Sequence, residues 1–308
     1  MKEFNEFALH HVSSDKDYFE GWYYKIQTDD FIFSVIFGIH QNHNEKEGFI
    51  QTIDTIRNES CYESFPWSMI QINEEPYEVQ FGNNSLSKEK LVLNLKNLKL
   101  SVDMGKFTTI EENKYMPTIM GPFSYIPMEC VHSIISLYHQ CTGSLLYDDN
   151  EYEIDGIGYI EKDRGLSFPR KYLWFQSNQC ALNDSCFFLS LASIPISIIS
   201  FTGCICVLML EKEQYRFATY LGCKIKAIEV FEKDHIRYAN IRIKQHSYFL
   251  NIRLVQAKGS ALKAPKKGRM NVQIHEHLNS EAAISLYKSG KQIWKGVFKQ
   301  GASEIVNI

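Results

Sequence analysis

The sequence predicts an all-β protein. Short runs rich in Val, Ile, Phe, Tyr and Thr recur along the chain with turn residues between them, and amphipathic helix patterns are scarce. Aromatic residues make up 13% of the chain, a usage that favours strands and aromatic-lined pockets over helix bundles. At 308 residues the chain is long enough for one large domain or for two of ordinary size.

The first half of the chain contains eight of these runs. Each combines β-branched or aromatic residues with alternating or continuous apolar character, and each is bounded by turn formers, so each predicts a strand. The predicted strands are 19–27, 31–39, 50–56, 68–72, 91–95, 98–104, 133–140 and 143–147.

The second half follows the same rhythm. Its predicted strands are 151–160, 172–177, 186–192, 203–211, 215–220, 224–232, 236–244, 248–256, 271–278, 282–288 and 291–298. This number exceeds one simple barrel and predicts two barrels or a double sandwich. We place an N-terminal domain at residues 1–222 and a C-terminal domain at 223–308, although no flexible linker marks the boundary. Residues 105–128 and the basic stretch 258–269 are expected to be long functional or covering loops.

Residues 186–210 carry no charge and are long enough to be mistaken for a membrane span. Pro195, Thr202 and Gly203 interrupt the run, and its flanks have neither a basic bias nor an aromatic belt. Two buried strands are therefore expected, with a looser peripheral membrane contact as the alternative. The N-terminus does not resemble a signal peptide, and the cysteine spacing fits buried reduced thiols, so we expect a cytoplasmic location.

Charge and motifs exclude several function classes. The 33 Lys and Arg residues against 36 Asp and Glu give a net charge of -3, which provides no field for a nucleic acid backbone. We find no phosphate-binding loop, nucleophile elbow or zincin helix. The pairs His275 with His277 and His40 with His43 bring no obvious third ligand. No metal and no cofactor are therefore predicted.

Two dense clusters of polar and aromatic residues stand out, at 19–25 and at 158–169. At strand periodicity Glu20, Trp22 and Tyr24 share one face, while Tyr159, Glu161 and Asp163 share another. In a closed pocket, desolvation and mutual repulsion would raise the pKa of one such acid and keep it a proton donor at neutral pH. The alternative is that residues 161–164 form a solvated run of alternating charges in a loop.

These clusters belong to a set of blocks that resembles the tocopherol cyclase family. The blocks occur in the family's order over nearly the whole chain: 20–24 (EGWYY), 128–132 (MECVH), 158–169 (GYIEKDRGLSFP), 174–178 (WFQSN), 216–220 (RFATY), 259–265 (GSALKAP) and 270–276. One position departs from the pattern, because Arg164 stands where tryptophan is expected. This change is expected to alter the pocket wall or the charge beside Asp163.

The resemblance implies a fold related to carotenoid hydratases and lipocalin-like pericyclases, with two β-barrel-like halves and a ligand cavity near their junction. It also implies a reaction in which an acid protonates the alkene of a prenylated quinol and the phenol oxygen closes onto the tertiary cation. Such chemistry needs a donor acid in a dry pocket and aromatic faces that tolerate the cation. Asp163 is the first choice for the acid, Glu161 and Glu20 are the alternatives, and His132 is placed to orient a substrate oxygen or to take the phenol proton.

A hydrophobic small molecule is the expected partner, and the clusters around Trp22, Asp163 and Trp174 are expected to converge on it. The expected catalytic residues are Asp163, Glu161 and His132, and the expected substrate-binding residues are Glu20, Trp22, Tyr24, Glu129, Tyr159, Arg164, Trp174, Gln176 and Asn178. Gln176 and Asn178 would hold a polar head group or else satisfy each other. Three hypotheses remain open: a cyclase acting on a prenylated or polyene substrate, a non-catalytic carrier of a hydrophobic molecule, and an interaction protein whose cavity is filled by side chains.

Overall fold

The computed structural model describes residues 5–10, 16–43, 45–196, 199–256 and 259–308. It confirms the prediction of an all-β chain, because the only helices in these residues are three short 3-10 turns: η1 (Trp67–Met69), η2 (Gly121–Tyr125) and η3 (Thr219–Leu221). The chain divides into two compact units. Unit 1 consists of Met1–Phe168 and Lys263–Gln273, and unit 2 of Pro169–Leu262 and Ile274–Ile308.

Unit 1 is built on an 11-stranded antiparallel sheet with the order β4-β3-β2-β1-β11-β10-β9-β8-β7-β6-β5. The strands are β1 (Tyr18–Gln27), β2 (Ile32–Asn42), β3 (Glu45–Asp54), β4 (Ser60–Pro66), β5 (Ile70–Glu74), β6 (Tyr77–Phe81), β7 (Asn84–Ser87), β8 (Lys90–Leu95), β9 (Leu98–Met104), β10 (Cys130–Tyr147) and β11 (Asn150–Gly165). The edge strands β4 and β5 are joined by η1 alone. The sheet therefore curls until its two edges meet, which gives a nearly closed barrel.

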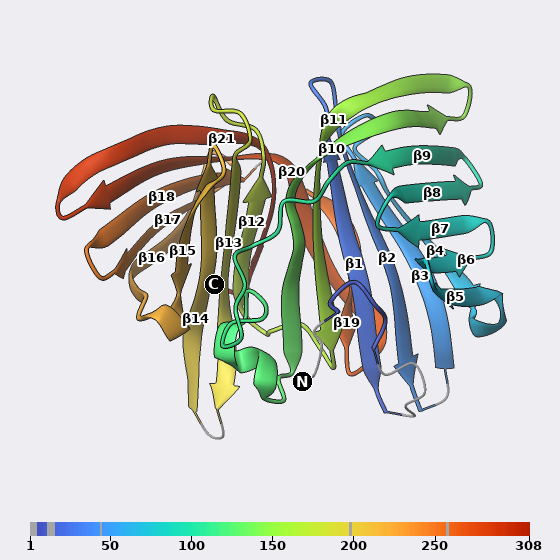
Figure 1. Cartoon of the computed structure of the whole chain (residues 1–308), viewed down its shortest axis with the longest axis horizontal. Coiled ribbons are helices and arrows are strands. Elements are labelled where there is room, and N and C mark those ends of the chain that lie inside the picture. Colours follow the sequence, from blue (N-terminus) through green and yellow to red (C-terminus); the bar gives the residue numbers. More distant parts are fainter. Residues whose placement is uncertain (1–4, 11–15, 44, 197–198, 257–258) are drawn as a thin grey trace. The chain divides into compact units, whose positions relative to one another are not determined.

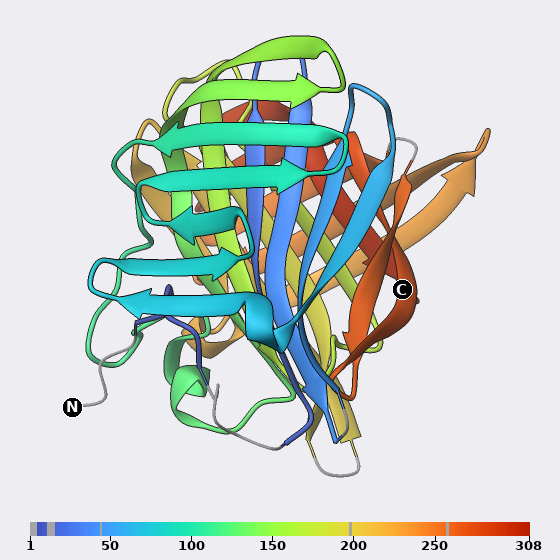
Figure 2. The same cartoon turned by 90° about the vertical axis from the view of Figure 1, so that its right-hand side faces the viewer.

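Apolar side chains fill the inside of this curled sheet. Strands β5–β9 run across β1–β3, as Figure 2 shows, and the two sets share one apolar cluster. Phe37 of β2 and Phe81 of β6 stack within it, with ring centroids 4.2 Å apart. Trp22, Tyr24 and Ile26 of β1 belong to the same cluster, so the even-numbered side chains of β1 point inward.

Unit 2 repeats this design. Its strands are β12 (Tyr172–Ser177), β13 (Cys186–Ile196), β14 (Ile199–Leu210), β15 (Glu213–Ala218), β16 (Lys224–Lys233), β17 (Ile236–Gln245), β18 (Tyr248–Gln256), β20 (Arg269–Lys288) and β21 (Lys291–Val306). They form a sheet with the order β15-β14-β13-β12-β21-β20-β18-β17-β16, and β19 (Ser260–Lys266) pairs with β20 (Figure 1). The edge strands β15 and β16 are again joined by one short turn, η3. At the end of β17, the side chain of Gln245 accepts a hydrogen bond from the amide of Ala218 and donates one to the carbonyl of Arg216, and so links β17 to the edge strand β15.

The strand prediction differs from the structure in two ways. Residues 133–147 and 271–288 each form one long strand, β10 and β20, where two shorter strands were expected. Bulges interrupt the pairing of both and break the alternation that the sequence pattern relies on. Strands β4, β6, β7 and β19 were not predicted.

The two expected loops have different outcomes. Residues 105–128 contain only η2 and isolated bridges, as expected of a loop. Residues 258–269 were expected to be a loop, but strand β19 occupies 260–266. Pro265 is tolerated there because β19 pairs only with β20 and so lies at an edge.

The division between the compact units lies at Phe168 and Pro169, and not at the boundary between residues 222 and 223 expected from sequence. Strand pairing explains the difference. β12 pairs with β21 along Tyr172–Gln176, so the segment from β12 to β15 is hydrogen-bonded into the same sheet as the C-terminal strands.

The uncharged segment 186–210 forms strands β13 and β14, as expected. Cys186, Phe188 and Leu208 of these strands are buried. Across the described ranges of the chain, no helix has the length and apolar character needed to span a membrane.

We expect Phe37→Ala to destabilise unit 1 by about 3–5 kcal/mol, because the change leaves a cavity beneath Phe81 in a packed core. Chemical unfolding measures the loss. Tyr115→Ala is the matched control, because Tyr115 is 75% exposed and its truncation should change the free energy of unfolding by no more than about 0.5 kcal/mol. A loss below about 1 kcal/mol for Phe37→Ala would contradict the packing described.

Candidate acid-base site

The candidate site lies on three neighbouring strands of unit 1. β11 pairs with β1 on one side and with β10 on the other, in the registers Gly21↔Asp163 and His132↔Asp163. Residues directly opposite each other in such a ladder point to the same face of the sheet. Tyr159, Glu161 and Asp163 therefore share the outer face with His132, whereas Ile160, Lys162 and Arg164 point inward.

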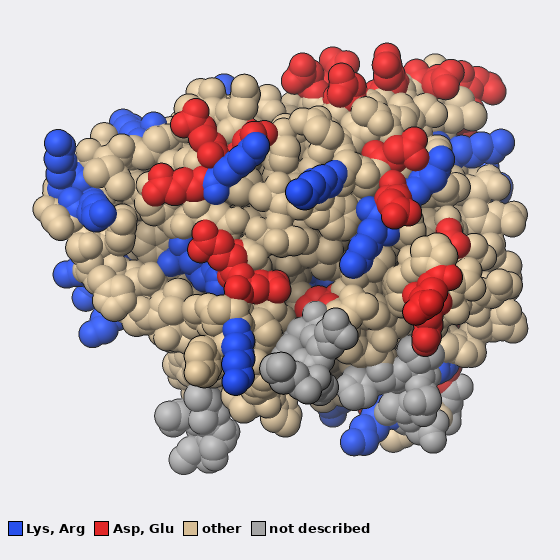
Figure 3. All heavy atoms as spheres, viewed as in Figure 1, with Lys and Arg blue, Asp and Glu red and all other residues tan. Residues whose placement is uncertain are grey.

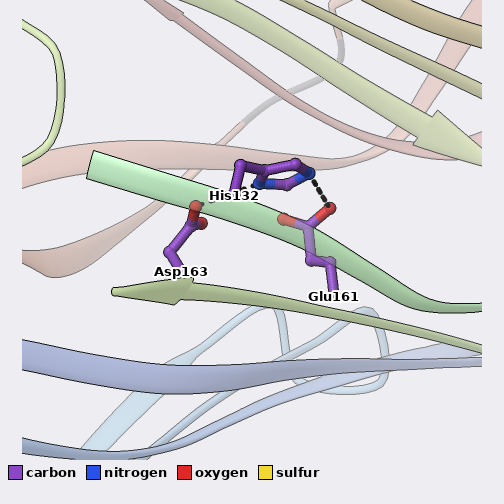
Figure 4. Close-up of side chains that lie close together, drawn as sticks. All are labelled: His132, Glu161 and Asp163. Carbon is purple, nitrogen blue, oxygen red and sulfur yellow. Dashed lines mark hydrogen bonds and ion pairs between the residues drawn. The ribbon is translucent and has the colours of Figure 1, made fainter. Parts of the chain in front are cut away.

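The imidazole of His132 lies between two carboxylates on this outer face (Figure 4). Its Nδ1 is 3.0 Å from Asp163 Oδ1, and its Nε2 is 3.7 Å from Glu161 Oε2. The hydroxyl of Tyr159 donates a hydrogen bond of 2.7 Å to the same Glu161 oxygen. The thiol of Cys130 approaches Asp163 Oδ1 at 3.7 Å. We call the group Tyr159, Glu161, Asp163 and His132 the His132 cluster.

The charges around His132 set its protonation state. Burial alone would lower the pKa of His132, but the charges of Asp163 and Glu161 outweigh it and raise the pKa to about 9. At neutral pH the ring is therefore an imidazolium that can donate from both nitrogens. The imidazole contacts two carboxylates, and its contact with Asp163 is the shorter one, so Asp163 orients the ring.

The same three groups could also hold a metal ion. The ligand atoms of His132, Glu161 and Asp163 all lie within 4.8 Å of one another, a set that the sequence analysis did not find. A bound metal would displace the ring proton and take the imidazole in its neutral form. The absence of a metal requirement stays a prediction.

The inner face of the same strands carries a second charged group centred on Glu20. Its carboxylate forms an ion pair with Lys162, and it accepts hydrogen bonds of 2.8 Å from the Tyr18 hydroxyl and from the amide of His10. Burial would raise the pKa of Glu20, but Lys162 and His10 outweigh burial and lower the pKa to about 2. Glu20 is therefore a fixed anion and a poor proton donor at neutral pH.

The N-terminal segment 5–10 completes this inner group. Glu6 pairs with Arg164 at 3.2 Å and accepts a hydrogen bond of 2.7 Å from Ser133. The carbonyl of Ala8 accepts a hydrogen bond from Lys162, and the indole of Trp22 donates to the carbonyl of Phe7 at 3.1 Å. The segment thus packs over the inner face of β1 and β11.

The predicted binding residues of unit 1 thus divide between the two faces. Trp22, Tyr24 and Arg164 point inward with Glu20, away from the His132 cluster. The buried hydroxyl of Tyr24 has no hydrogen-bond partner among the residues that the structure describes. Because Arg164 points inward, its guanidinium pairs with Glu6 and does not lie beside Asp163. Glu129 is exposed, and its backbone carbonyl accepts a hydrogen bond from Leu166.

The remaining predicted residues belong to unit 2. Trp174 is buried on β12, on the face opposite Leu173 and Phe175, which belong to the apolar cluster of that unit. Gln176 donates a hydrogen bond of 2.6 Å to Asn178, and the Asn178 amide donates one of 3.3 Å to the carbonyl of Ser185, while the role of the two amides in binding stays a prediction. Their convergence with Trp22 and Asp163 stays a prediction.

Sequence reasoning missed part of the site. The alternative interpretation of residues 161–164 as a solvated loop is wrong, because they lie in β11, and Glu161 and Lys162 are only 5% and 1% exposed. Partners contributed by β10 and by residues 5–10 compensate the buried charges. Glu6, His10 and Cys130 were not predicted. Their partners lie more than a hundred positions away in sequence or on another strand, and no spacing motif connects such pairs.

Two histidines on β10 should titrate in opposite directions. The pKa of His132 is raised to about 9, whereas burial lowers the pKa of His139 to about 4. Because the folded-state pKa of His132 is raised, its protonation stabilises the fold fully below about pH 6.5, and this stability is lost as the pH rises through about 9. NMR titration of labelled histidine side chains measures both values. Asp163→Asn should lower the His132 midpoint, and a wild-type midpoint at or below 6.5 would refute the assignment.

Glu20→Gln should destabilise unit 1 by about 3–5 kcal/mol, because it leaves the buried ammonium of Lys162 without its carboxylate. Since the pKa of Glu20 is lowered, the stability that it contributes in the wild type is present above about pH 4.5 and is lost as the pH falls through about 2. Chemical unfolding at pH 7 measures the effect. Glu74→Gln serves as control, because Glu74 is exposed on β5. Equal stability of the two variants would show that the inner ion pair does not hold the fold.

Comparison with known proteins supports the fold. No protein family profile and no curated protein matches the sequence. Solved structures do match. An AttH-like protein of Nitrosomonas europaea has a TM-score of 0.58 and 9% identity, covering 100% of this chain and 97% of that chain.

Two further structures match over similar lengths. Kievitone hydratase of Nectria haematococca has a TM-score of 0.54 and 11% identity, covering 96% of this chain and 93% of its own. CghA in a structure with Sch210972 has a TM-score of 0.61 and 9% identity, covering 94% and 89%. The chain therefore shares the lipocalin-like fold of AttH, kievitone hydratase and CghA.

Proposed function

We propose that the protein binds a hydrophobic small molecule with an alkene and catalyses a proton-initiated reaction on it, of the kind that tocopherol cyclases carry out on prenylated quinols. The observation that carries this proposal is the His132 imidazolium held between Asp163 and Glu161. General acid catalysis needs a positioned side chain that carries a proton at the working pH, and His132 is such a group.

The two contacts of the imidazole suggest separate roles for its nitrogens. Nδ1 is held by Asp163 at hydrogen-bond distance, whereas Nε2 lies 3.7 Å from Glu161, and we assign the proton transfer to Nε2. Transfer of this proton to an alkene carbon leaves a neutral imidazole and a tertiary cation. When the phenol oxygen attacks the cation, the phenol proton returns to the imidazole, and the net change is an isomerisation.

Glu161 and Tyr159 fit supporting roles in this scheme. The Glu161 carboxylate lies beside Nε2 and stabilises the positive charge before and after transfer. The Tyr159 hydroxyl fixes that carboxylate by donating to it, and its ring lies on the same face. Asp163, the first choice for the acid from sequence, becomes the residue that orients His132.

The structural relatives are compatible with this class of chemistry. One carries the name of a hydratase, and another was solved with Sch210972. Hydration begins with the same proton transfer, with water in place of the phenol oxygen. A cytoplasmic location and a peripheral membrane contact are proposed on sequence grounds alone.

The experiment begins with mass spectrometry of lipids extracted from the purified protein, followed by turnover and binding assays with prenylated quinols and polyenes. We expect His132→Gln and Asp163→Asn each to reduce turnover by roughly 100-fold or more while ligand affinity changes by no more than a few-fold. Turnover of the wild type should fall as the pH rises through about 9, where His132 loses its proton.

Asp103→Asn is the matched control, because Asp103 is an exposed carboxylate of the same unit that pairs with Lys90 at the surface. It should leave turnover unchanged. Tight binding without turnover of any substrate would favour the carrier. Full turnover by His132→Gln would refute the acid assignment and leave Glu161 to be tested.

A further inference from the structure

Unit 2 has a second surface with the features of a binding site, on the outer face of β16, β17, β18, β20 and β21. The inward residues of these strands, such as Ile241, Ile252 and Ile284, belong to the apolar cluster of the unit. The residues between them therefore point outward. Strand register aligns them in two rows: Ala227, Arg242, Asn251, Ser285 and Lys295 in one, and Glu229, Asn240, Arg253, Ala283 and Val297 in the other.

The surface formed by these two rows contains a groove. A groove with a volume of about 360 Å³ is lined by residues of both rows. Its depth follows from the small side chains of Ala227, Ala283 and Ser285, which lie between longer neighbours.

The groove is positively charged. Arg242, Arg253 and Lys295 line it, against a single acid, Glu229. None of these three cations forms an ion pair with another residue in the described part of the chain. Figure 3 shows Lys and Arg side chains along the left edge of the view, which belongs to unit 2. The Oδ1 atom of Asn251 is buried and, among the described residues, has no hydrogen-bond partner.

Aromatic and apolar side chains flank the charged rows on both sides. Phe231 and Tyr238 stack with centroids 5.2 Å apart, and Phe249 contacts Tyr287 edge-on at 6.4 Å. Phe231 and Val297 are exposed despite their apolar character, at 41% and 40%. The face thus combines a cationic centre with apolar margins.

We propose that this groove binds an amphipathic organic anion: a small molecule with one carboxylate or phosphate group attached to an apolar body. Arg242 and Arg253 present planar donor forks that match either oxyanion, and Lys295 adds a third charge. The aromatic margins provide the surface for the apolar body. The inference is independent of the proposed function, because no residue of the His132 cluster takes part.

Calorimetry with dodecyl phosphate below its micellar concentration tests the proposal. We expect one molecule to bind per chain, at least tenfold more tightly than inorganic phosphate or a neutral dodecyl ether. The double variant Arg242→Ala/Arg253→Ala should weaken binding at least tenfold. Both arginines are exposed, so their removal should not unfold the protein.

Lys171→Ala/Lys212→Ala is the matched control, because it removes the same charge from exposed residues of unit 2 that do not line the groove. Equal loss in both double variants would overturn the proposal, since the effect would then come from net charge. Binding to phosphatidylserine vesicles without binding of free dodecyl phosphate would also overturn it, in favour of a membrane surface. Chemical-shift changes confined to the amides of Asn251, Ser285 and their neighbours on adding dodecyl phosphate would support it.

Discussion

The constraint on which unit 1 depends is that β11 is buried on both faces while carrying alternating charges. A strand sends successive side chains to opposite faces, so Glu161 and Asp163 separate from Lys162 and Arg164 although the four are neighbours in sequence. The pleat thus prevents these neighbours from neutralising one another. Each charge must find its partner on another segment, because an unpaired buried charge is costly.

The two faces meet this requirement in different ways. The outer face uses β10, which contributes His132 between the two carboxylates. The inner face uses β1 and the N-terminal segment, which contribute Glu20 and Glu6 to Lys162 and Arg164. The opposite pKa directions follow from this sorting. Two anions raise the pKa of His132, whereas a cation lowers the pKa of Glu20.

The sequence predicted what depends on local pattern. Alternation placed Glu20, Trp22 and Tyr24 on one face of β1 and the Tyr159 row on a face of β11, because period two is a local property. Alternation did not predict which face of β1 lies on the same side of the sheet as which face of β11, since register is set by pairing between distant strands. For the same reason the contacts of residues 5–10 were missed. Edge strands such as β4 and β19 were missed because they bury little apolar surface and their composition resembles loops.

The fold accounts for only one of the two charged groups. The inner group ties the N-terminal segment to the sheet, so its ion pairs have a structural role. The His132 cluster, in contrast, connects β10 and β11, which are already paired through their backbones from Cys130↔Gly165 to Ile134↔Glu161. Replacing such a buried charged set by apolar residues of similar size is often neutral or stabilising. Groups whose pKa values are shifted by specific charged partners cluster at functional sites, and the imidazolium held between two carboxylates is therefore the part of unit 1 on which the proposed chemistry rests.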